Sequence, residues 1–150
     1  MPKVDLTAAL TKHGDSYPPP LNLMCAQISR TKLGNAVGLT DFGVSLLRLP
    51  PGQWSAQRHW HEEEDEFVMI VEGEVVLVED GGETVLVAGD FAGFPRDAPN
   101  GHHLQNRSGR VAVVLEIGSR RPGSACHYPD VDLEAPAGSS GYVHKDGTPY

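Results

Sequence analysis

The apolar residues of this chain occur in short runs that glycine and proline interrupt. The longest runs, Phe67–Val71 and Val111–Leu115, contain only five residues each. Glycine and proline number 17 and 12, well above their usual share, while 39% hydrophobic residues still provide material for a core. No window of eleven or more residues repeats apolar positions with the helical period. Short apolar segments joined by turns are typical of an all-β sandwich or barrel, so we expect few helices.

Length, charge and cysteine content limit the function classes. At 150 residues the chain has the size of one compact domain. Its formal charge of −8 disfavours binding to nucleic acid or to anionic membranes. It contains neither a run of about twenty apolar residues for a membrane span nor an apolar secretion signal. Because Cys25 and Cys126 form neither a CxxC pair nor a disulfide framework, we expect a reduced, cytoplasmic protein.

Three regions differ in pattern along the chain. Residues 1–40 show little regularity beyond a possible short strand at Leu21–Arg30, and we interpret them as an N-terminal arm packing on a barrel at 41–120. Residues 121–150 are rich in small residues, and they predict either a flexible tail or a packed C-terminal arm. The barrel strands are expected at Val44–Leu49, Glu66–Val71, Glu74–Val78, Thr84–Ala88, Phe91–Phe94, His102–Gln105 and Arg110–Ile117, with a hairpin turn at Asp80-Gly81-Gly82.

One strand is apolar on both faces. Phe67, Met69 and Val71 alternate with Val68 and Ile70. One facing sheet covers only one side of such a strand, so the other side needs a second subunit or a terminal segment. This pattern predicts a homodimer.

Two histidines separated by one residue are the most informative feature. His59 and His61 lie within Arg58–Glu66. On a strand, such residues face the same side about 6.6–7 Å apart, and both imidazoles can bind one ion at about 2.0–2.1 Å. On a helix they would diverge by about 200°. The pair therefore predicts a metal site on extended chain, with two surface histidines beside an acidic loop as the alternative.

A carboxylate ligand is expected among the five acids that follow. Adjacent like charges cannot all point inward, so most of the acids between Glu62 and Glu66 belong to a solvated loop. Only Glu66 shares a strand face with Val68 and Ile70. A carboxylate on a buried face is unfavourable unless it is paired or binds a metal, so this parity selects Glu66. A second strand carrying one of His102 and His103 would complete a site of three histidines and one carboxylate.

The chain resembles the cupin superfamily of small jelly-roll barrels, also described as double-stranded β-helix barrels. The first cupin motif matches from Gly52 to Gly73 with one extra residue before His59, and the second matches from Gly89 to Asn106 with Asp97 in place of glycine and two extra residues. The resemblance implies an all-β barrel with irregular N-terminal and C-terminal arms. The metal ligands that it implies are His59, His61, Glu66 and His102. The insertion leaves His103 as the alternative to His102, and the His-x-x-x-Asn spacing favours His102.

The function implied by the resemblance is chemistry at one divalent transition metal per chain, either Zn, Mn, Fe or Ni. The segments RHWHEEEDEF, PNGHHLQN and HKDGTPY are similar to those of small bacterial cupins, some of which are labelled sugar-phosphate isomerases. We therefore expect a small-molecule enzyme of isomerase or lyase type. An Fe(II)-dependent dioxygenase and a non-catalytic small-molecule sensor are the alternatives.

A sugar-phosphate substrate requires cationic side chains near the metal. Arg48 precedes the first motif and Arg96 lies in the loop beside the second, so both are candidate substrate-binding residues. Strand parity places Arg58 opposite the ligand face. The alternative is that these arginines are surface residues that balance the acidic loop.

Overall fold

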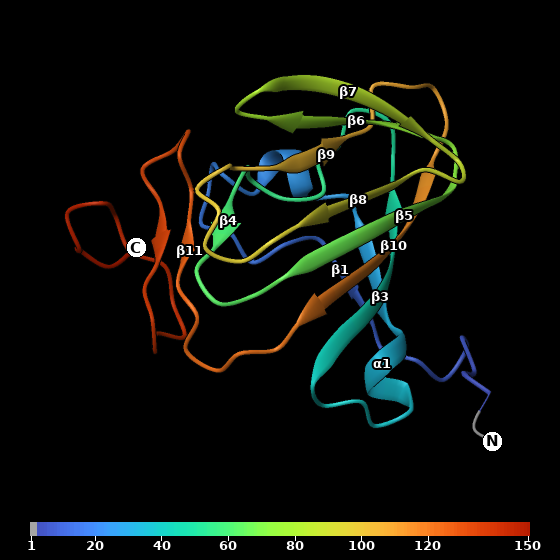
Figure 1. Ribbon diagram of the computed structural model, residues 1–150, viewed down its shortest axis with the longest axis horizontal. Helices are drawn as coiled ribbons and strands as arrows, with labels where there is room; N and C mark the ends of the chain where they lie inside the picture. The colour runs from blue at the N-terminus through green and yellow to red at the C-terminus, as the bar shows by residue number, and fades with distance from the viewer. Residues whose placement is uncertain (1–2) are drawn as a thin grey trace.

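The computed structural model describes residues 3–150 (Figure 1), and in this part of the chain nearly all regular structure is β. The all-β expectation is therefore confirmed. The first two residues of the arm expected over 1–40 lie outside the described residues. All strand pairs described are antiparallel.

The main sheet has six strands in the order β1-β2-β3-β10-β5-β8. Their bounds are β1 Thr11–His13, β2 Ser29–Lys32, β3 Phe42–Leu49, β10 Ala112–Ser119, β5 Glu66–Glu72 and β8 Phe91–Phe94. Because β10 pairs with both β3 and β5, the register sets Leu47, Val114 and Ile70 side by side. All three are fully buried, and burying each such side chain stabilises the fold by about 1.5–3 kcal/mol.

Two smaller sheets lie against the main one (Figure 1). The first has the order β7-β6-β9, with bounds β6 Glu74–Glu79, β7 Gly82–Val87 and β9 His103–Gln105. The second has the order β12-β11-β4, with bounds β4 Trp60–His61, β11 Cys126–His127 and β12 Glu134–Ala135. The hairpin expected at Asp80-Gly81-Gly82 joins β6 to β7, with Glu79 paired to Gly82.

Helices contribute little. The 3-10 turn η1 spans Leu23–Cys25, and α1 spans Leu33–Ala36. None of the helices in residues 3–150 has the length and apolar character to cross a membrane.

The N-terminal arm extends the main sheet. Its strands β1 and β2 pair with each other, and β2 pairs with β3. The strand predicted over Leu21–Arg30 begins only at Ser29, because Leu23–Cys25 forms the 3-10 turn. Arg30 and Lys32 lie opposite Leu47 and Ser45 of β3, so the arm contributes charged side chains to the inner face of the sheet.

Several residues of the C-terminal segment are buried against the rest of the chain. Leu133 is fully buried and Tyr128 nearly so. Tyr17 of the N-terminal arm packs against Tyr128 and Tyr142, with ring centroids 5.7 and 5.5 Å apart. Aromatic contacts at this separation are favourable, so the two arms meet over one end of the barrel.

The outer face of β5 and β8 carries exposed aromatic residues. Phe67 and Phe91 are 43% and 58% exposed, with ring centroids 5.9 Å apart, and Val71 is 43% exposed. Within residues 3–150, neither arm buries these side chains. The face therefore stays available to a second molecule.

Candidate metal centre

Strand pairing brings the two histidine segments together. His59 and His102 form an antiparallel bridge, with hydrogen bonds in both directions between their backbones. Directly opposed residues present their side chains on the same face. His61 follows two residues after His59 on β4, so it shares that face. Glu66 begins β5 and faces inward with the buried Val68.

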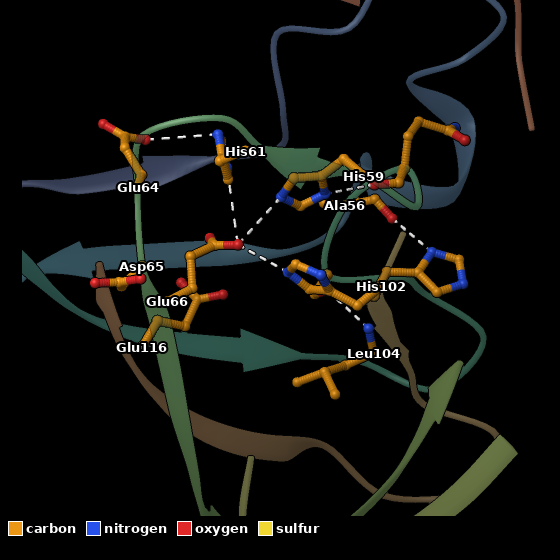
Figure 2. A network of polar contacts seen from close by, with 12 residues as sticks. Ala56, His59, His61, Glu64, Asp65, Glu66, His102, Leu104 and Glu116 are labelled. Atoms are coloured by element: carbon orange, nitrogen blue, oxygen red, sulfur yellow. Dashed lines mark hydrogen bonds and ion pairs between the residues drawn. The ribbon is translucent and has the colours of Figure 1, made fainter. Parts of the chain in front are cut away.

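The three imidazoles converge on one carboxylate oxygen of Glu66 (Figure 2). Glu66 Oε2 lies 2.8 Å from His102 Nε2, 3.6 Å from His59 Nε2 and 3.7 Å from His61 Nε2. Two donors bound to one ion at about 2.1 Å lie about 3.0–3.4 Å apart, depending on geometry. The observed separations lie within about 0.3 Å of that range on either side, so small side-chain shifts would let the four residues bind one ion. The donor atoms of His59, Glu66 and His102 lie within 4.8 Å of one another, and His61 lies in a second such group with His59 and Cys126.

The ring nitrogens suit metal binding. The Nδ1 atoms of His59 and His102 contact the carbonyls of Gln57 and Asn100 at 2.8 and 3.4 Å, which directs each Nε2 toward Glu66. A backbone carbonyl at Nδ1 fixes ring orientation and tautomer, as in many metal sites. His61 Nδ1 is buried without a hydrogen-bond partner in the described chain, 3.6 Å from Glu64 Oε2. Three imidazoles and one carboxylate can therefore hold a divalent ion, with each imidazole binding through a ring nitrogen that carries no proton.

Burial and mutual attraction set the pKa values in this cluster. Burial by itself raises the pKa of Glu66, but the hydrogen bond with His102 and the close contacts with His59 outweigh it and hold that pKa well below its usual range. Burial by itself lowers the pKa of His59, yet its contacts with Glu66 raise it overall. For His61, burial dominates and lowers the pKa to about 4. The centre thus keeps its carboxylate ionised and His61 neutral, as ligands must be.

His103 lies apart from this cluster. It follows His102 on the chain, so strand alternation turns its ring toward Trp54, at 4.8 Å between ring centroids. Its Nδ1 donates to the carbonyl of Ala56 at 2.9 Å, and its Nε2 accepts from the Gln105 amide at 2.9 Å. Although His103 borders the same cavity, both ring nitrogens are already engaged. The geometry favours His102 over His103 as a ligand.

Cys126, which belongs to none of the sequence motifs, lies beside the centre. Cys126 on β11 is paired with His61 on β4. Its sulfur lies within 4.8 Å of donor atoms of His59 and His61. Burial raises the pKa of this thiol to about 12, so it stays protonated near neutral pH. A signal for this position is absent from the sequence because a lone cysteine on a two-residue strand has no pattern.

The centre opens into a cavity of about 380 Å³. Its walls come from both arms as well as from the barrel. Tyr17, Tyr128 and Tyr142 line one side, and Arg30 and Glu116 line the inner face of the main sheet. Arg30 holds Glu116 through two hydrogen bonds of 2.8 and 3.2 Å. Sequence reasoning missed Glu116, although the parity that selected Glu66 also places Glu116 on the buried face of β10, beside Val114.

The two arginines expected near the substrate lie elsewhere. Arg48 is exposed on β3, between the buried Leu47 and Leu49, and therefore points away from the core. Arg96 is exposed in the loop after β8. Neither lines the cavity, so their role in substrate binding stays a prediction that this geometry does not favour. Arg58 lies off the ligand face, as expected, and forms ion pairs with Asp80 and Asp130.

The environment of His103 predicts loss of stability in acid. Burial lowers its pKa to about 4 from 6.5, so between these pH values the unfolded chain binds a proton that the folded chain does not. The contribution of His103 to stability is therefore fully present above about pH 6.5 and falls by about 3 kcal/mol as the pH approaches 4. Urea unfolding of the metal-free chain at pH 7 and 4.5 measures this loss. His103→Gln should reduce the pH dependence by most of that amount, and an unchanged dependence would contradict the assignment.

Comparisons with known proteins agree with this geometry. The profile of the cupin domain family matches residues 45–118. The crystal structure of a cupin-superfamily sugar phosphate isomerase from Silicibacter pomeroyi is 44% identical, with a TM-score of 0.92, and the match covers 99% of this chain and 96% of that one. A candidate sugar phosphate isomerase from Acidithiobacillus ferrooxidans is 29% identical, with a TM-score of 0.78, over 91% and 88% of the two chains. A search of curated proteins gave no match.

These matches define the class of protein. The chain belongs to the cupin superfamily, and its fold is the jelly-roll barrel of that superfamily. The polyketide cyclase RemF from Streptomyces resistomycificus is similar in fold alone, at 19% identity and a TM-score of 0.64 over 83% of both chains. Because such barrels support different reactions, the reaction has to be argued from the site.

Proposed function

We propose that this protein is a metal-dependent isomerase of sugar phosphates, with one divalent ion held by His59, His61, Glu66 and His102. The observation that carries the proposal is the convergence of three Nε2 atoms on Glu66 Oε2 at 2.8–3.7 Å. This centre opens into a cavity that contains a second carboxylate, Glu116. The similarity to the sugar phosphate isomerase from S. pomeroyi supports the same reaction class.

The donor set suits Zn, Mn, Fe or Ni, because mixed nitrogen and oxygen ligands do not select among these ions by affinity. When bound, such an ion supplies Lewis-acid polarisation of a carbonyl or hydroxyl oxygen. The protein residues have to bind the sugar phosphate, exclude water and move a proton. The tyrosines at the junction of the arms cover the cavity and provide hydroxyl groups for a polyhydroxylated chain.

Glu116 is the residue placed to move that proton. Glu116 on β10 pairs with Val68 on β5, and Val68 lies two residues after Glu66 on the same face. Glu116 therefore lies on the inner face of the sheet, near the centre. Its side chain is 23% exposed. In an aldose–ketose interconversion, Glu116 takes the proton from the carbon next to the carbonyl and returns it to the former carbonyl carbon. The hydroxyl proton moves between the two oxygens, so no other reactant is consumed.

A deuterium-exchange assay tests this function. Metal-loaded protein is incubated in D₂O with a panel of aldose and ketose phosphates, and NMR follows product formation and deuterium at the carbon next to the carbonyl. Isomerisation with exchange at that carbon is the expected result. Absence of both across the panel would overturn the isomerase proposal. Oxygen uptake by the Fe(II)-loaded protein would indicate the dioxygenase alternative, and binding without turnover would indicate the sensor.

We also propose a homodimer in the cytoplasm. The free, buried thiols of Cys25 and Cys126 suit a reducing compartment. For the dimer, we propose that a second copy covers the exposed aromatic face of β5 and β8, because large apolar side chains left in water favour association.

Replacement of Phe67 and Phe91 by glutamate is expected to shift a dimer to a monomer, since charges would be buried in the interface. Light scattering after gel filtration measures the mass. The control is Leu23→Glu, which adds a charge at a residue that is 64% exposed in η1. A wild-type monomer, or a dimer that persists in the double variant, would contradict the assignment.

A further inference from the structure

The end of the cavity farthest along the main sheet from Glu66 is cationic. Lys12 of β1 and Lys32 of β2 line the cavity together with Arg30. Lys12 pairs with Arg30 across the two strands, and Lys32 follows Arg30 by two residues, so all three share the inner face. Every lysine or arginine among the described residues that line the cavity therefore comes from the N-terminal arm.

Arg30 is already neutralised. Its guanidinium forms ion pairs with Glu116 at 2.8 Å and with Asp15 at 3.3 Å, and it donates to the carbonyl of Ser55. Its pKa stays above its ordinary value, since attraction to Glu116 outweighs the effect of burial. Arg30 is thus a structural cation that positions Glu116, and it has little capacity left for a ligand.

The two lysines differ from Arg30. Neither Lys12 nor Lys32 forms an ion pair within residues 3–150. Lys32 is half-buried, and burial together with repulsion from Arg30 lowers its pKa. Three cations face two carboxylates, Asp15 and Glu116, at this end of the cavity, in a chain whose formal charge is −8. An anion between the lysines would relieve that repulsion.

We propose that Lys12 and Lys32 form the subsite that binds the phosphate group of the substrate. The inference deepens the proposed function, because it orients the sugar phosphate with its phosphate at the N-terminal arm and its carbonyl at the metal centre. A phosphate monoester carries close to two negative charges at neutral pH and three acceptor oxygens. Two ammonium groups match both its charge and its acceptors, whereas a single carboxylate would leave one lysine without a counter-charge.

The distance between the two ends fits such a substrate. Three strand spacings, from β2 through β3 and β10 to β5, separate Lys32 from Glu66. At about 4.8 Å each, they amount to about 14 Å along the sheet. The lysine side chains project into the cavity from one end and the imidazoles from the other, so the remaining gap is shorter than this distance. It suits a short hydroxylated carbon chain.

Calorimetric titration with inorganic phosphate tests the subsite without turnover. The wild-type chain is compared with Lys12→Gln/Lys32→Gln and with the control Lys3→Gln/Lys145→Gln, which removes two exposed lysines outside the cavity. We expect phosphate affinity to fall about tenfold or more in the first variant and to stay unchanged in the control. Metal content should be equal in all three, and Lys12→Arg/Lys32→Arg should restore binding.

Unchanged phosphate affinity in Lys12→Gln/Lys32→Gln would overturn the subsite. Loss of phosphate affinity in Arg48→Ala or Arg96→Ala instead would also overturn it. The titration is repeated on metal-free protein, where binding should persist, because phosphate that requires the ion binds at the metal centre. The subsite and the isomerase proposal can fail separately. Lysine-dependent phosphate binding without isomerisation rejects only the reaction, whereas isomerisation that is insensitive to the lysines rejects only the subsite.

Discussion

Replacement of His102 by alanine is expected to release the metal ion, whereas replacement of His103 by alanine is expected to leave the metal content unchanged. His102 Nε2 lies 2.8 Å from Glu66 Oε2, in the centre of the cluster. Both ring nitrogens of His103 are engaged by Ala56 and Gln105. The two histidines are adjacent, similarly buried and equal in chemistry, so each variant is the matched control of the other.

The expected magnitude for His102→Ala is a loss of metal affinity of about hundredfold or more, since even partners behind a ligand contribute about 10–100-fold. Elemental analysis after dialysis gives the metal per chain, and competition with a chelator gives the affinity. Urea unfolding separates metal loss from misfolding, because His103→Ala should also destabilise the chain by removing a buried ring. Metal loss in His103→Ala alone would exchange the two assignments. Retention of the metal in both variants would show that neither His102 nor His103 is a ligand.

The central residues of this site could be predicted because their geometry is local. The spacing of His59 and His61, and the parity of Glu66 with Val68, follow from the alternation of side chains along a strand. His102 could be distinguished from His103 only through the resemblance to the family, because the choice depends on a bridge to His59, which belongs to a distant segment of the chain. The all-β class could be predicted for a similar reason, because short apolar segments joined by turns are also a local feature of the sequence.

The walls of the cavity could not be predicted because they depend on long-range pairing. Lys12, Arg30 and Lys32 belong to strands of three or four residues, which are too short to show a period. Their common face is defined only once β2 pairs with β3. Arg48 and Arg96 were expected to bind substrate because they lie close in sequence to the two motifs. In the antiparallel sheet, however, the side chain of Arg48 points outward. Basic residues that lie near a motif in sequence are thus a weaker guide to the lining of the cavity than basic residues on strands paired with the site.

Replacement of Glu116 by glutamine is expected to lower the turnover of sugar phosphates by about 10²–10⁴-fold, the usual contribution of a general base. The amide keeps the size of the side chain and an acceptor for Arg30, but it cannot take a proton. Arg30 also retains Asp15 and the carbonyl of Ser55. Glu116 is not one of the residues whose donor atoms cluster as candidate metal ligands. Metal content and KM should therefore change little while kcat falls.

Deuterium exchange and steady-state kinetics on metal-loaded protein measure this effect. Glu74→Gln is the control, since Glu74 is exposed on β6 and lies outside the cavity. Glu116→Asp keeps the basic group but shortens its reach, and it should retain part of the exchange. If Glu116→Gln turned over normally, the base would have to be another group. If it lost activity together with its metal, Glu116 would be a support of the centre instead of a base. A fall in kcat at constant metal content and KM is the result that assigns proton transfer to Glu116, because only an interaction made in the transition state changes kcat in this way.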